Sequence, residues 1–178
     1  MRFKDAAAVL DGIPYTSPHK GRIFYDFILD NGIRSALELG FAHGVSSGYF
    51  AAALDQTDGR LHSVDLAEAG FSPAIEELVE KLGLEQRVEV HREISSYTWF
   101  LYRMIAAQTK NGICEPIYDF IFIDGPKDWT NDGAAFFMAA KLLKPGGWIM
   151  FDDYAWNYRD DERLRGKNHA TGYVFPKM

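Results

Sequence analysis

The stretch Ser35-Ala36-Leu37-Glu38-Leu39-Gly40-Phe41-Ala42-His43-Gly44 decides the fold of this chain. Residues 35–39 predict a short buried strand, and a glycine-rich turn follows at once. The run Val45-Ser46-Ser47-Gly48-Tyr49-Phe50-Ala51 then predicts a helix. Gly40 and Gly44 let the backbone approach a ligand closely, and the start of the helix points free N–H groups into the same space. This strand–turn–helix unit predicts a site for a nucleotide-like ligand.

The acid at the end of the predicted strand indicates which ligand. Glu38 stands just before the first glycine, where a carboxylate would repel a phosphate. A carboxylate suits a ligand that carries hydroxyls and positive charge, and S-adenosylmethionine (SAM) has both. A dinucleotide-binding turn would need glycine at Ala42 and at Val45, which argues against a dehydrogenase.

Strand and helix patterns alternate along the 178 residues, which we expect to form a single domain, 1–178. Further strands are predicted over 61–64, 88–91, 118–123 and 148–151. Helices are predicted over about 20–29, 45–54, 72–83, 96–109 and 132–143. Apolar strands that are each followed by a helix indicate a parallel sheet buried on both faces. The predicted fold is therefore α/β, a doubly wound, mainly parallel, Rossmann-like sheet.

Carboxylates stand at the ends of these strands: Glu38, Asp65, Asp124, Asp152 and Asp153. Ligands of a doubly wound sheet bind at this edge. Any one of these acids could instead be a turn residue or a helix cap, but that explanation fits the whole set poorly. Two adjacent acids at one strand end would repel each other unless a cation is bound. The last two strands are neighbours in this topology, so Asp124, Asp152 and Asp153 predict a Mg²⁺ site.

These residues resemble the class I SAM-dependent methyltransferases over about 15–156. Residues 38–44 are similar to the first motif of that superfamily, 118–124 to its fourth motif, and 142–147 to the loop before its fifth strand. The resemblance implies that Asp65 holds the ribose hydroxyls of SAM. We expect Glu38 to anchor the turn and the methionine part, and the segment 93–95 to frame the adenine. The full expected set of cofactor-binding residues is Glu38, Gly40, Ala42, Gly44, Ser46, Asp65 and Ser95.

This sequence combines motifs that resemble two different groups within the superfamily. Asp124-Gly125-Pro126-Lys127-Asp128 and Ser17-Pro18-x-x-Gly21 are similar to segments of the cation-dependent catechol and caffeoyl-CoA O-methyltransferases. This likeness implies that Asp124 binds a divalent metal and that Lys127 is the catalytic base. The pair Asp152-Asp153 is instead similar to the Asp-Asp of bacterial sugar and macrolide O-methyltransferases, which also need magnesium. Those enzymes usually carry a histidine base after the fourth motif, which this sequence lacks, so the acceptor class stays open.

Composition limits the partners. The net charge is −6 and no dense basic cluster occurs, so we expect no nucleic-acid partner. No apolar run approaches the roughly 20 residues of a membrane span, so we expect no membrane partner and a cytoplasmic location. The expected partner is a small hydroxylated acceptor. A homodimer is one assembly that the sequence leaves open.

Three hypotheses follow. The main one is a Mg²⁺-dependent SAM O-methyltransferase that acts on a small molecule. The second is a metal-independent SAM methyltransferase, in which the acid pair is structural. The third is a SAM-binding module without catalysis, because the superfamily usually completes its sheet with a C-terminal antiparallel hairpin, and about 25 polar residues after the fifth strand leave that hairpin incomplete.

Several aromatic side chains are expected near the same edge: Tyr15, Trp129, Tyr154, Trp156 and Tyr158. They would line the acceptor pocket or pack in the core and its rim. His43 is expected to be a solvated turn residue.

Overall fold

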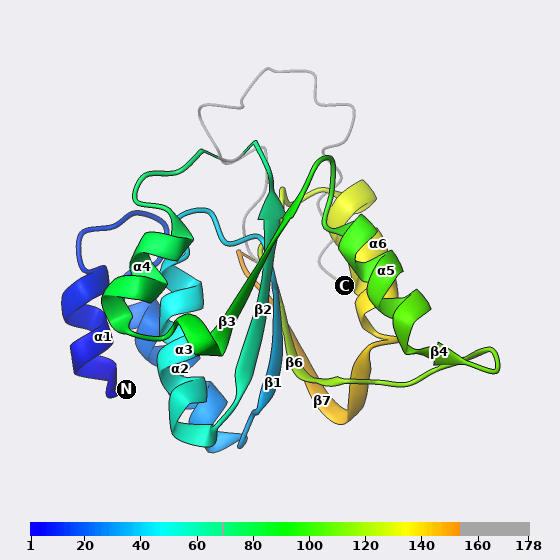
Figure 1. The fold of residues 1–178 in the computed structure, drawn as a ribbon, viewed down its shortest axis with the longest axis horizontal. Coiled ribbons are helices and arrows are strands. Elements are labelled where there is room, and N and C mark those ends of the chain that lie inside the picture. The colour runs from blue at the N-terminus through cyan, green and yellow to red at the C-terminus, as the bar shows by residue number, and fades with distance from the viewer. Residues whose placement is uncertain (69, 154–178) are drawn as a thin grey trace.

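The computed structural model describes residues 1–68 and 70–153. A five-stranded parallel sheet lies between two layers of helices, in the strand order β3-β2-β1-β6-β7 (Figure 1). The doubly wound α/β fold is therefore confirmed. The strands are β1 (Ser35–Leu39), β2 (Arg60–Leu66), β3 (Val88–Glu93), β6 (Tyr118–Ile123) and β7 (Leu143–Phe151). A separate two-stranded hairpin joins β4 (Thr109–Lys110) to β5 (Ile113–Cys114).

Helices cover both faces of the sheet. Among the described residues, a layer of helices lies on each face (Figure 1). The first layer consists of α1 (Phe3–Leu10), α2 (Pro18–Asp30), α3 (Val45–Thr57) and α4 (Ile75–Leu82). The second layer consists of α5 (Thr98–Gln108) and α6 (Ala134–Ala139). Two short helical turns, the 3-10 turn η1 (Glu85–Arg87) and the π turn η2 (Trp129–Gly133), complete the described elements.

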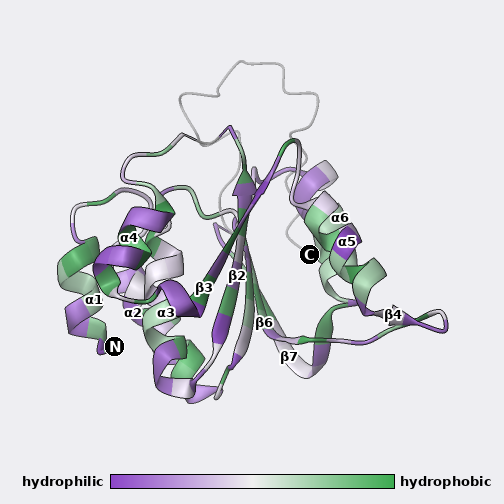
Figure 2. Ribbon diagram, viewed as in Figure 1, coloured by the Kyte–Doolittle hydropathy of each residue, from purple (hydrophilic) through white to green (hydrophobic). Residues whose placement is uncertain are grey.

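The two central strands explain why the sheet needs helices on both faces. Side chains alternate between the faces of a strand. On β6, Phe120 and Phe122 pack against the layer of α1–α4, whereas Ile121 and Ile123 pack against the layer of α5 and α6. All four side chains are buried. Figure 2 shows the hydrophobic residues of β6 between the two layers.

The strand order also determines where a ligand site can form. From β1 the chain moves outward to β2 and β3, and then crosses to β6 and β7 on the other side of β1. The direction of winding reverses between β1 and β6. A crevice opens at such a reversal, at the carboxyl ends of the strands.

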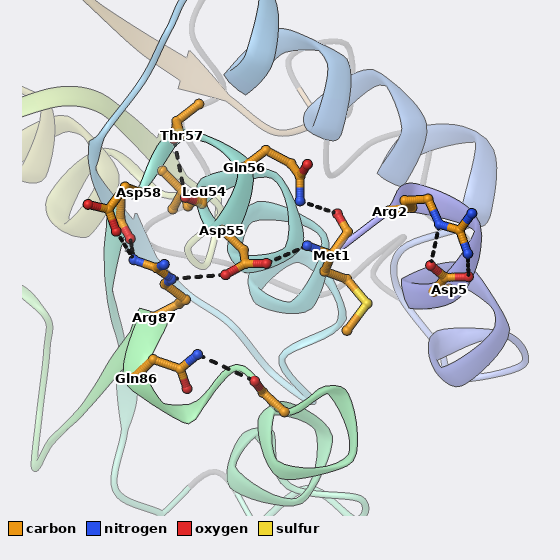
Figure 3. A network of polar contacts seen from close by, with 12 residues as sticks. Met1, Arg2, Asp5, Leu54, Asp55, Gln56, Thr57, Asp58, Gln86 and Arg87 are labelled. Atoms are coloured by element: carbon orange, nitrogen blue, oxygen red, sulfur yellow. Dashed lines mark hydrogen bonds and ion pairs between the residues drawn. The ribbon is translucent and has the colours of Figure 1, made fainter.

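Helix α1 was not predicted, and long-range contacts hold it in place. The N-terminal ammonium of Met1 pairs with Asp55 at the end of α3, and Arg87 reaches the same carboxylate at 3.1 Å (Figure 3). Gln56 Nε2 donates to the Met1 carbonyl at 3.0 Å. Leu10 is buried against the same layer. An eight-residue helix is too short to be stable alone, so these contacts decide whether it forms.

The predicted bounds need two corrections. Helix α4 begins at Ile75 rather than at the Ser72-Pro73 pair. The helix predicted over 132–143 ends at Ala139, and β7 begins at Leu143 instead of at Trp148. The Leu142 carbonyl accepts the backbone N–H of Tyr118 at 2.9 Å, which draws this segment onto the sheet edge. An irregularity in the register then accommodates residues 144–147.

Among residues 1–68 and 70–153, no helix has the length and apolar character needed to cross a membrane. The expected C-terminal hairpin and the aromatic residues Tyr154, Trp156 and Tyr158 lie outside the described residues.

Candidate active site

A cavity of about 380 Å³ lies at the carboxyl ends of β1, β2 and β6. Small-molecule sites usually measure ~300–1,000 Å³, so the cavity has the size of a cofactor site. Five of the seven residues predicted to bind the cofactor line it: Gly40, Ala42, Ser46, Asp65 and Ser95. Asp124, predicted as a metal ligand, lines it as well.

The turn between β1 and α3 forms one wall of the cavity. Gly40 has φ +95°, and a Cβ atom there would lie 2.2 Å from the carbonyl oxygen of Asp124. Gly44 has φ +88°, and a Cβ atom there would lie 2.5 Å from Ile75 Cγ1. Only glycine therefore fits either position without a shift of its neighbours. Gly44 caps α3 and is absent from the cavity lining, so the structure assigns it a role in shaping the turn.

Glu38 lies beneath the turn and does not line the cavity, which corrects its expected contact with the methionine part. The side chain is fully buried and accepts hydrogen bonds from three serine hydroxyls: Ser46 at 2.5 Å, Ser63 at 2.5 Å, and Ser47. Burial raises the pKa of Glu38 to about 7, against the lowering effect of these bonds. Its expected role as an anchor of the turn agrees with this geometry.

Asp65 holds the same turn from the end of β2. Its Oδ2 atom accepts the backbone N–H groups of Phe41 at 2.9 Å and of Ala42 at 2.7 Å, and Oδ1 accepts that of Leu66 at 2.7 Å. A carboxylate has about four lone-pair sites, so Asp65 keeps acceptor capacity for a ligand hydroxyl. The carboxylate is half-buried at the cavity wall.

The three predicted metal ligands come together at the ends of β6 and β7. One carboxylate oxygen from each of Asp124, Asp152 and Asp153 lies within 4.8 Å of the others. Two ammonium groups accompany them. Lys127 Nζ pairs with Asp124 and lies 3.8 Å from Asp153 Oδ2. Lys20 Nζ, which the sequence did not predict, lies 2.5 Å from Asp152 Oδ2.

The charges of this acid cluster are incompletely balanced, since three carboxylates face two ammonium groups. Burial is the main cause that raises the pKa of Asp124 to about 6; Lys127 opposes the rise, and the neighbouring Asp152 adds to it. The donors Asp124, Asp152 and Asp153 offer oxygen alone, which is the ligand type that Mg²⁺ prefers. The residues present therefore fit a hard divalent cation.

A buried network that the sequence did not predict sets the backbone of Lys127. Lys127 has φ +64°, and its backbone N–H donates to Asp132 Oδ2 at 2.7 Å. The Tyr97 hydroxyl donates to the other oxygen of Asp132. Burial raises the pKa of both Tyr97 and Asp132. A Cβ atom at Gly125 would lie 2.0 Å from the Tyr97 hydroxyl, so the loop fits closely over this pair.

Only part of the segment 93–95, which was expected to frame the adenine, lines the cavity. Ser95 and its neighbour Ser96 line the cavity, and Ser96 Oγ donates to Asn131 Oδ1 at 3.2 Å. Glu93 is buried and paired with Arg103, so it is not available to a ligand in the cavity.

Aromatic side chains form part of the cavity rim. Tyr15 is 71% exposed, and its ring centroid lies 5.8 Å from that of His43 and 6.0 Å from that of Phe71. His43 is not solvated as expected, because it is half-buried and its Nδ1 lies 2.9 Å from the Pro73 carbonyl. Trp129 packs with Phe137, 6.4 Å between centroids, and is not among the lining residues.

A family model described as a methyltransferase domain matches residues 37–154, which is more than half of the chain. The chain belongs to this methyltransferase family. The matched segment contains the end of β1, the glycine turn and the acid cluster. The resemblance to class I SAM-dependent methyltransferases is therefore confirmed.

Solved structures agree with this membership. A putative O-methyltransferase from Klebsiella pneumoniae superimposes with a TM-score of 0.67 at 20% identity, and the O-methyltransferase TomG from Streptomyces achromogenes with 0.65 at 22%. Each comparison covers 97% of this chain and 72% of the other, and shows the shared fold. An O-methyltransferase from Bacillus cereus is 28% identical, with a TM-score of 0.64 over 88% of this chain and 64% of that chain. No curated protein sequence matches this chain.

Glu38 makes a pH-dependent contribution to stability. Its pKa is about 7 in the folded state and 4.5 without the fold, so the folded state binds the proton more tightly. This contribution is complete below pH 4.5 and is lost as the pH rises through 7. We expect wild type to lose on the order of 2 kcal/mol between pH 5 and pH 8 relative to Glu38→Gln, in urea unfolding. Parallel pH profiles of the two proteins would contradict the assignment.

Alanine substitutions at Gly40 and Gly12 form a matched test and control. Both have positive φ, but a Cβ atom at Gly12 meets nothing within 4 Å. Gly12→Ala should cost only the ~1–2 kcal/mol of a left-handed residue. Gly40→Ala also forces the turn away from Asp124, so we expect it to weaken binding of S-adenosylhomocysteine at least roughly tenfold, about 1.4 kcal/mol. Calorimetry measures this affinity, and equal affinities in the two variants would refute the close-approach argument.

Proposed function

We propose that this methyltransferase transfers the methyl group of SAM to a hydroxyl group of a small molecule, with a divalent cation such as Mg²⁺ held by the acid cluster. One observation carries the proposal. Asp124 both lines the cofactor cavity and belongs to the acid cluster, so the site for the donor and the candidate site for the cation meet at one residue.

The solved structures support the reaction class. The printed descriptions of the Streptomyces and Bacillus proteins name them as O-methyltransferases, in complex with SAM and S-adenosylhomocysteine respectively. Both share the fold of this chain, and the Bacillus protein is 28% identical to it. An oxygen acceptor is consistent with the acid cluster, because a hydroxyl group needs to lose its proton to become a good nucleophile.

Bound SAM supplies an electrophilic methyl group, so the protein mainly has to align the reactants. The backbone at Gly40 and Ala42 forms a wall of the cavity that a ligand can approach closely. Asp65 is positioned to accept hydrogen bonds from a diol. Ser95 lines the same cavity, two residues after the end of β3. Alignment of this kind supplies up to ~7–11 kcal/mol of a reaction barrier.

Asp124, Asp152 and Asp153 would hold the cation, which when bound favours the ionised form of an acceptor hydroxyl. The ammonium of Lys127 now pairs with Asp124, and a cation at the cluster competes with that pair. We assign Lys127 Nζ as the group that takes the proton of the acceptor. The ammonium would first release its own proton to solvent, and a cation at the cluster would favour that release by electrostatic repulsion. Lys20 remains beside Asp152 and balances the negative charge of the cluster.

A metal-independent transfer is the second candidate, and one observation favours it. Lys20 and Lys127 already neutralise two of the three carboxylates. In that case the acid cluster positions Lys127, and no cation is required. The third hypothesis, a module without catalysis, depended on residues after 153, which lie outside the described residues.

Cation dependence separates the two candidates. Methyl transfer is measured with Mg²⁺ over a panel of catechols, phenols and sugars, and Mg²⁺ binding by calorimetry. We expect EDTA or Asp152→Asn to lower turnover at least roughly 100-fold, because several kcal/mol of charge stabilisation is lost. Asp30→Asn, at an exposed carboxylate at the end of α2, should behave as wild type. Full turnover in EDTA would establish the metal-independent candidate instead.

Lys127→Met tests the base. We expect kcat to fall by roughly 10²–10⁴ with the affinity for S-adenosylhomocysteine unchanged. The affinity for Mg²⁺ should stay equal or rise, because the competing ammonium is gone. Lys141→Met, at an exposed lysine after α6, is the control. A Lys127→Met enzyme with wild-type kcat would remove the lysine from the reaction.

A further inference from the structure

A second group of metal-ligating side chains lies away from the acid cluster, on β2 and β3. His62 and Glu89 are paired across the two strands, and His91 is two residues beyond Glu89. The three side chains therefore project from the same face of the sheet. That face is covered by α5, where the Phe100 ring centroid lies 4.6 Å from that of His91 and 6.1 Å from that of His62. One ligand atom from each of the three residues lies within 4.8 Å of the others.

We propose that His62, Glu89 and His91 bind a divalent transition-metal ion of the Zn²⁺ type. His62 Nε2 lies 3.4 Å from Glu89 Oε2, and His91 Nε2 lies 3.3 Å from Glu89 Oε1. Nitrogen and oxygen ligands lie ~2.0–2.2 Å from zinc in a tetrahedral site, which places them ~3.3–3.5 Å from one another. The two nitrogen–oxygen separations, one to each oxygen of Glu89, are close to that spacing, and one ligand atom of each residue lies within 4.8 Å of the others.

His91 supplies an independent sign of a missing ligand. Its Nε2 atom is buried, and among the described residues it makes no hydrogen bond. Unsatisfied polar atoms are rare in protein interiors and call for an explanation, and a bound ion is one established explanation. A metal ion beside Glu89 would satisfy this nitrogen.

His62 is oriented as metal-binding histidines usually are. Its Nδ1 lies 2.6 Å from the hydroxyl of the buried Tyr118, on β6. A hydrogen bond at Nδ1 fixes the ring, and when Nδ1 is the donor it directs the Nε2 lone pair toward Glu89. Burial lowers the pKa of both His62 and His91.

The two candidate cation sites differ in chemistry. The acid cluster offers only oxygen atoms, which suit Mg²⁺, whereas imidazole nitrogens suit Zn²⁺ and its neighbours. Glu89 is 66% exposed, so an ion can enter from solvent, and a water molecule can take the fourth position. An ion here would bind β2 to β3, and its three ligands are not among the residues that line the cavity.

Zinc titration of the 178-residue chain, with excess Mg²⁺ present to occupy the acid cluster, tests the proposal. We expect one Zn²⁺ per chain by calorimetry, a rise in Tm, and the visible absorption of a tetrahedral site when Co²⁺ replaces Zn²⁺. Glu89→Gln and His91→Gln should abolish this binding. Glu80→Gln, at an exposed glutamate on α4, and Asp124→Asn, in the acid cluster, should retain it.

Tyr118→Phe refines the test, since it removes only the hydroxyl beside His62. We expect roughly 10–100-fold weaker Zn²⁺ binding. Circular dichroism checks that each variant is folded, and the exposed Glu89 keeps the test independent of core packing. No Zn²⁺ binding by wild type, binding unchanged in folded Glu89→Gln, or binding lost only in Asp124→Asn would overturn the proposal.

Discussion

The buried carboxylate of Glu38 sets the geometry of the cofactor side of this protein. Burying a carboxylate costs several kcal/mol unless hydrogen bonds compensate. Here Ser46 and Ser47 of α3 and Ser63 of β2 supply three, so the end of β1, the first turn of α3 and the middle of β2 are tied to one point. The cost of the burial is still visible in the raised pKa of Glu38. The glycine turn above it has little freedom to move.

The rest of the site is built outward from that point. Asp65 fastens the far side of the turn through the backbone N–H groups of Phe41 and Ala42. Gly40 lets β1 approach the end of β6, where Asp124 begins the acid cluster. The neighbouring strand β7 contributes Asp152, whose backbone N–H donates to the Ile123 carbonyl at 3.0 Å. Donor cavity and acid cluster therefore share β6, which lies between β1 and β7 in the sheet.

Local patterns predicted the parts of the fold that local forces determine. The sequence predicted β1 and β6 with their observed bounds, because apolar residues on both faces of a strand leave little choice of structure. It also predicted that Asp124, Asp152 and Asp153 would meet, since parallel topology brings strand ends together. The predicted start of β7 was wrong because the sequence of residues 144–147 is typical of a turn. In the structure these residues form an irregular part of the strand.

The sequence could not predict contacts between residues that are far apart along the chain. Lys20 reaches Asp152 across 132 positions, and Tyr97 reaches Asp132 across 35, and neither pairing leaves a local signal. Glu38 was expected to touch the cofactor because its position matched a family motif, but the serines that bury it come from two other elements. The three residues that we propose to bind zinc share a sheet face only through the register of β2 and β3.

The most direct test is a crystal structure of the protein with S-adenosylhomocysteine and Mg²⁺. The account predicts the nucleoside in the cavity between Gly40 and Ser95, with the ribose hydroxyls on Asp65. It also predicts one Mg²⁺ on Asp124, Asp152 and Asp153, with Lys127 displaced from Asp124. Glu38 should remain on its serines, out of contact with the ligand. A nucleoside bound elsewhere, or a Glu38 carboxylate that turns to meet it, would contradict the account.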